Sequence, residues 1–117
     1  MSLVSRYLEA KGIPTVVIGS ARDIVEECGV ARFIFNDFPL GNPVGKAYDM
    51  AMQRATLGHA LDLLESARLP RTTVQTPFRW SDDEAWRAVY ARVDDSNREA
   101  LKAEGEARRA SQAAIKG

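Results

Sequence analysis

Two apolar runs and one mixed run along the chain have the length and composition of β-strands. Ile13–Ile18 is rich in β-branched residues, and Arg32–Phe35 and Thr72–Thr76 follow it in order. The first run is continuously apolar rather than alternating, a pattern typical of a strand that is covered on both faces of a parallel sheet. We therefore expect a small parallel sheet built from these segments.

Helical patterns separate the strands. Short helices are predicted at Ser5–Lys11 and at Ala21–Cys28, the second with Ser20 as its N-cap. The clearest pattern covers Asp49–Arg68, where apolar residues recur at steps of three and four. Gly58 lies inside that helix, and we expect it to permit the close approach of a neighbouring element. The alternation of strands and helices predicts an α/β fold.

The chain divides into an α/β domain at residues 1–80 and a helical C-terminal extension at residues 81–117. Ser81 is followed by three acidic residues, which predicts the start of a helix. From Asp94 onward the large apolar residues are Leu101 and Ile115, so this arm cannot bury a core alone. The fold class is then a small Rossmann- or flavodoxin-like parallel sheet with a helical arm. Its few helices suggest that a partner chain completes the sheet.

Charge and cysteine content exclude several classes of protein. The formal net charge at pH 7 is zero, which argues against a dedicated nucleic-acid binder. The first residues contain no apolar run long enough for a secretory signal, and no stretch approaches the roughly 18 apolar residues of a membrane span. Cys28 is the single cysteine and cannot form an internal disulfide, which fits a reducing cytoplasm. We expect a cytoplasmic protein that binds neither nucleic acid nor membrane.

The Pro39–Pro43 string follows the second predicted strand, where parallel folds place ligand groups. Backbone N–H groups around Gly41 and Asn42 can hold a carboxylate or a phosphate. The alternative is a stiff turn that only redirects the chain into the long helix.

Other chemical candidates are weaker. His59 has no second histidine or cysteine at ligand spacing, so it indicates no metal site, and it is a weak catalytic candidate together with Asp37. Arg79 beside Trp80 can bind an anion or belong to an aromatic plug. Cys28 near a helix C-terminus is a packing residue rather than a nucleophile. No cofactor is expected in this chain.

Three segments resemble the selenoprotein B subunits of glycine, sarcosine and betaine reductases and their D-proline reductase relatives. They are YLEAKGIPTV at 7–16, GVARFI at 29–34 and PLGNP at 39–43, in the family's order. The helix that follows, with ALDLL at 60–64, is similar in kind. The resemblance covers about Tyr7 to Leu69, which corresponds to a C-terminal segment of that family.

This chain departs from the family at its redox centre. The family's selenocysteine or cysteine lies in a U/C-G-S-C string upstream of these segments, and the chain contains no such string. Phe38 stands where the family has a histidine. The resemblance therefore implies the small subunit of a split reductase, whose larger subunit carries a redox-active Cys or Sec.

Such a complex would reductively cleave a C–N or similar C–heteroatom bond in a small-molecule substrate. The arginines would neutralise a carboxylate, and the remaining residues would line a cleft at the strand ends. The resemblance and the position in the fold together give a predicted substrate-binding set of Ser20, Arg32, Gly41, Asn42, Pro43 and Arg79. Two alternatives stay open: a non-catalytic interaction or scaffold subunit, and a homo-oligomeric lyase or hydrolase that uses Asp37 and His59 between protomers.

Overall fold

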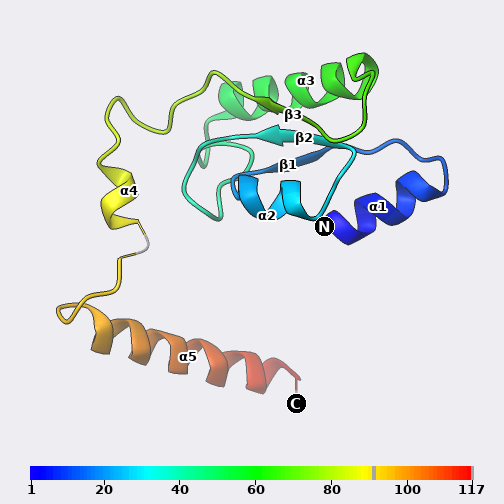
Figure 1. The fold of residues 1–117 in the computed structure, drawn as a ribbon. Helices are drawn as coiled ribbons and strands as arrows, with labels where there is room; N and C mark the ends of the chain where they lie inside the picture. Colours follow the sequence, from blue (N-terminus) through cyan, green and yellow to red (C-terminus); the bar gives the residue numbers. More distant parts are fainter. Residues whose placement is uncertain (91, 117) are drawn as a thin grey trace. The chain divides into compact units, whose positions relative to one another are not determined.

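A computed structural model describes residues 1–90 and 92–116 of the chain (Figure 1). It divides into two compact units, Met1–Glu84 and Ala85–Gly117, which we describe separately. Ala91 and Gly117, both within the predicted helical extension, lie outside the described residues.

The first unit contains a parallel sheet of three strands: β1 (Val17–Gly19), β2 (Arg32–Phe35) and β3 (Thr72–Gln75). The strand order is β1-β2-β3, so β2 is central and pairs with both neighbours in parallel. The structure thus confirms the predicted small parallel α/β fold. Because the strands are parallel, their carboxyl ends all meet at one end of the sheet.

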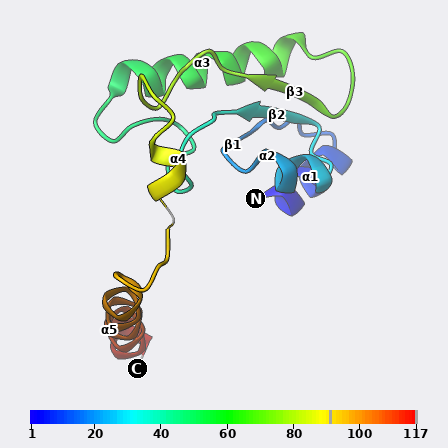
Figure 2. The same ribbon diagram turned by 60° about the vertical axis from the view of Figure 1, so that its left-hand side comes forward.

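Helices cover both faces of this sheet. The long helix α3 (Met50–Ser66) lies on one face, and α1 (Ser2–Ala10) and α2 (Arg22–Glu27) lie on the other (Figures 1 and 2). Asp49 caps α3, since its carboxylate accepts the Met52 N–H at 2.9 Å.

The core follows the alternation of side chains along β2. Ile34, fully buried, packs against Ala60 and Leu63 of α3. Phe33 points to the opposite face, where its ring and Val25 of α2 both lie close to Gly19. Burial on both faces explains why three consecutive apolar residues follow Arg32 in this strand.

The first strand is shorter than the predicted Ile13–Ile18. Pro14 has no N–H, and the Thr15 N–H donates to the carboxylate of Glu9 rather than to a neighbouring strand. Regular pairing therefore begins only at Val17.

Two predicted helix starts are wrong. Ala21, not Ser20, precedes α2, and no side chain caps that helix. The helix expected at Ser81 begins later, as α4 (Trp86–Val89), because the Ser81 hydroxyl donates to the Asp83 carbonyl in a local turn. The close approach expected at Gly58 is also absent, since nothing lies within 4 Å of the position a Cβ would take there.

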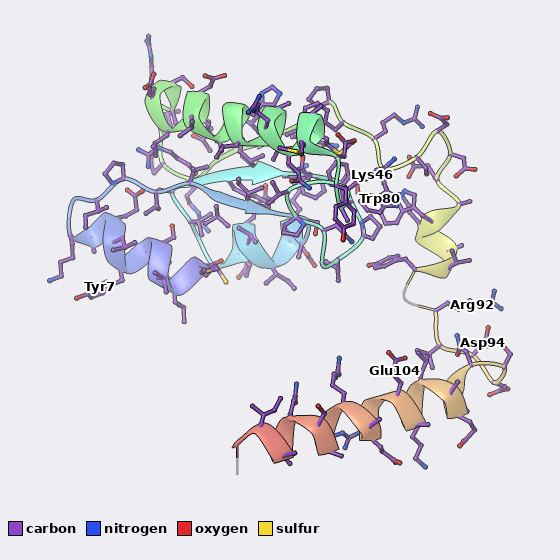
Figure 3. All side chains as sticks on the ribbon, turned by 180° about the vertical axis from the view of Figure 1, so that it is seen from behind. Tyr7, Lys46, Trp80, Arg92, Asp94 and Glu104 are labelled. Carbon is purple, nitrogen blue, oxygen red and sulfur yellow. The ribbon has the colours of Figure 1, made fainter. Side chains whose placement is uncertain are left out.

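The second unit holds α4 and α5 (Arg98–Lys116). The Trp86 and Tyr90 rings lie 5.5 Å apart in α4, and Arg92 pairs with Asp94 at 2.7 Å before α5 begins (Figure 3). No helix among the described residues is long and apolar enough to span a membrane.

Candidate functional site at the carboxyl end of the sheet

Asn36, directly after β2, is fully buried, and its side chain and backbone together contact four parts of the first unit. Its Nδ2 donates to the Pro43 carbonyl at 2.8 Å and lies 3.4 Å from the Thr56 hydroxyl of α3. The Thr76 hydroxyl, just after β3, donates to Asn36 Oδ1. The Asn36 backbone N–H donates to the Gly19 carbonyl of β1 at 2.9 Å. This amide therefore fixes the start and the end of the loop that follows β2.

The Pro39–Pro43 string forms a tight turn within that loop. The Asn42 N–H donates to the Pro39 carbonyl at 3.2 Å, and Gly41 has φ +96° at the third position. A positive φ at that position favours glycine, because it has no Cβ to clash with the backbone. The string is thus a stiff turn that lies at the carboxyl end of the sheet, and its role in ligand binding stays a prediction.

An aromatic pair joins the connection after β2 to the one after β3. The buried Phe38 ring lies 5.6 Å from the Trp80 ring. Lys46 Nζ lies 5.7 Å from the centre of the same Trp80 ring, and Figure 3 shows the two side chains side by side. This arrangement places a positive charge near the carboxyl end of the sheet.

Ser20 and Asn42 both lie in loops at this end. Each is half-buried, and neither side chain makes a hydrogen bond to any residue that the structure describes. Ser20 follows β1, while the turn that holds Asn42 is anchored through Pro43. These two side chains therefore remain available to a ligand.

Arg32 lies elsewhere. It is the first residue of β2, at the amino end of the sheet, and its guanidinium pairs with Glu9 of α1 at 2.8 Å. Desolvation acts to raise the pKa of Glu9, but hydrogen bonds from Thr15 and the Arg32 charge outweigh it and hold the pKa below its usual value. Arg32 thus clamps α1 to the sheet and does not share a site with the Pro39–Pro43 turn.

Arg79 follows β3 but is directed to local partners. Its guanidinium donates to the Asp82 carbonyl at 3.1 Å and lies 3.8 Å from Glu84. Its side chain is 65% exposed, so solvent screens this charge.

The weak catalytic candidates occupy different elements. His59 lies on α3 with its ring 5.7 Å from Phe78, and Asp37 follows Asn36. Cys28 caps the C-terminus of α2. Within the described residues, no group of three or more His, Cys, Asp and Glu side chains is arranged to hold a metal ion.

Our sequence analysis did not single out Asn36, Thr56 or Thr76. A signal was present: an amide directly after a buried strand, and a threonine on the core face of the long helix. Nothing in the sequence spacing indicates that these residues meet, since they lie 20 and 40 positions from Asn36.

The fold and the site define a small parallel α/β protein with a structured loop at its strand ends. Comparison with protein families, with curated proteins and with solved structures finds no match.

Proposed function

We propose that this chain is the small subunit of a split reductase. The observation that carries the proposal is the Pro39–Pro43 turn, which Asn36 anchors at the carboxyl ends of a parallel sheet. This is the position where parallel α/β proteins bind ligands. The same turn carries part of the resemblance to the glycine, sarcosine, betaine and D-proline reductases.

In this proposal the redox chemistry belongs to a larger subunit. Its thiol or selenol, together with a second thiol, is oxidised to a disulfide or selenenylsulfide. The two electrons and two protons that this oxidation releases form a C–H bond on the substrate carbon and an N–H bond on the departing amine as the C–N bond breaks. A dithiol reductant then restores the larger subunit.

This chain contributes binding groups and shape. The Ser20 hydroxyl and the Asn42 amide, which have no partners among the described residues, hydrogen-bond the substrate. The positive charge of Lys46 favours a substrate carboxylate near the same end of the sheet. Arg32 takes no part, because Glu9 already pairs with it at the opposite end.

A native pull-down of the tagged full chain from its own cells, with mass spectrometry, tests this proposal. We expect a stoichiometric partner that carries a C-G-S-C or U-G-S-C string. Recovery of the chain without such a partner would contradict the split reductase. It would favour the scaffold or the homo-oligomeric enzyme, which Asp37→Ala and His59→Ala would then probe.

A further inference from the structure

The two outer strands of the sheet differ in how they meet solvent. β3 has the sequence Thr-Thr-Val-Gln and lies between Pro70 and Pro77, which have no N–H to offer a neighbour. Thr73 of β3 lies near Glu26, and its hydroxyl holds the pKa of that carboxyl below its usual value. Polar side chains and flanking prolines are features that protect an edge strand from pairing.

The outer strand β1 also follows a proline, Pro14, but it has no polar side chain within the strand. Its sequence is Val-Ile-Gly, and the Gly19 carbonyl accepts the N–H of Asn36, the residue that follows β2. Because successive backbone groups of a strand point to opposite sides, the N–H and C=O of Ile18 point away from β2. These groups are available to another strand.

The long helix presents a second apolar face above this edge. Its core face holds Thr56, Ala60 and Leu63, all buried. A different face, at helical spacing, holds Met50, Leu57 and Leu61, which are 73%, 51% and 53% exposed. Over roughly 16 Å, at 1.5 Å per residue, this face is long enough to receive about three turns of another helix.

A groove joins the helix face to the strand edge. It has a volume of about 380 Å³ and is lined by Ile18, Val44, Met50, Gln53, Arg54 and Leu57. Arg54 makes no hydrogen bond or ion pair with any residue that the structure describes. An unpaired guanidinium in an apolar groove favours an acidic group on the segment that occupies the groove.

We infer that the larger subunit docks on this side of the sheet, adding a strand to β1 and packing a helix against the outer face of α3. The added helix carries apolar residues against Leu57 and Leu61 and an Asp or Glu opposite Arg54. This is the strand-plus-helix unit by which parallel α/β sheets grow. The inference rests on the proposed function and specifies which edge of the sheet the partner joins.

Matched substitutions test this docking surface. Leu57→Asp and Arg54→Glu alter it, while Leu69→Asp and Arg68→Glu make the same changes at exposed positions beyond α3. Each full-length variant is checked by circular dichroism. Its affinity for the purified larger subunit is then measured by biolayer interferometry.

We expect Leu57→Asp and Arg54→Glu to weaken binding at least about tenfold and the two controls to bind within about twofold of the unaltered chain. Hydrogen exchange at residues 16–19 should slow in the complex, while exchange at residues 72–75 stays unchanged.

Three results would overturn the inference. Equal affinity of all four variants for a confirmed partner would place the docking elsewhere and leave the proposed function intact. A dimer of this chain that Leu57→Asp dissociates in sedimentation would assign the surface to a second copy. Failure to recover any Cys- or Sec-bearing partner would reject the proposed function, and this inference with it.

Discussion

The side chain of Asn36 links the central strand to β3, to α3 and to the Pro39–Pro43 turn. Asn36→Ala leaves the Pro43 carbonyl and the Thr76 hydroxyl without their partner in a buried site. Each unsatisfied buried group costs about 1–3 kcal/mol. We expect the free energy of unfolding to fall by about 2–4 kcal/mol, measured by urea denaturation.

Asn42→Ala is the matched control, because this half-buried amide makes no hydrogen bond among the described residues. Its free energy of unfolding should change by less than about 0.5 kcal/mol, while, under the proposed function, the activity of the complex with the larger subunit falls. Unchanged activity would remove Asn42 from the substrate site. Equal stability of the two variants would contradict the anchoring role of Asn36.

The ion pair between Glu9 and Arg32 predicts a pH dependence of stability. The pKa of Glu9 is lowered in the folded chain, so its contribution is complete above the ordinary glutamate pKa and is lost as the pH falls through the lowered value. Glu9→Gln should destabilise the chain by about 1.5–3 kcal/mol at pH 7, and by less in strongly acidic solution. Urea denaturation between pH 7 and pH 2.5 measures this difference, and a constant difference across that range would refute it.

Among the strands and helices, those with strong patterns were predictable from the sequence. β2 lies at the predicted Arg32–Phe35 because its residues are apolar on both faces, and α3 extends over Met50–Ser66 within the predicted range. The predictions failed where a local hydrogen bond competed with the expected helix cap. The Ser81 hydroxyl, for example, donates to the Asp83 carbonyl instead of capping a helix.

The candidate site was predictable only in part. The Pro39–Pro43 string marks a turn by its composition, whereas its anchor depends on Thr56 and Thr76, which lie far from Asn36 in the sequence. Arg32 was expected near the turn, but it lies at the amino end of β2. This position depends on the direction of the strand, which a single charged residue in the sequence does not indicate. The pairing of Arg32 with Glu9 likewise depends on how α1 packs.

Two glycines in different elements should respond oppositely to alanine. Gly41 has φ +96° in the turn, so Gly41→Ala should lower the free energy of unfolding by about 1–2 kcal/mol although the space around it is open. Gly58 lies inside α3 without a positive φ, and the space around it is equally open. Gly58→Ala should therefore raise the free energy of unfolding by about 0.5–1 kcal/mol. Thermal unfolding of both variants measures this, and a shift of the same sign in both would contradict the assigned backbone geometry.

For the chain as an assembly, the proposed function and the docking surface lead to one expectation. The sheet has three strands, one edge is protected, and the other carries an apolar groove and an unpaired arginine. Under the proposed function, we expect a second polypeptide to supply both the missing strand and the redox-active thiol or selenol.

The most direct test is reconstitution of the activity from the two purified chains. Reductive C–N cleavage is measured as amine release from glycine, sarcosine and betaine and as formation of the ring-opened amino acid from D-proline, with a dithiol as reductant. The account predicts cleavage only when both chains are present, and a loss of cleavage with Asn42→Ala. Full activity of the larger subunit alone, or of this chain alone, would contradict it.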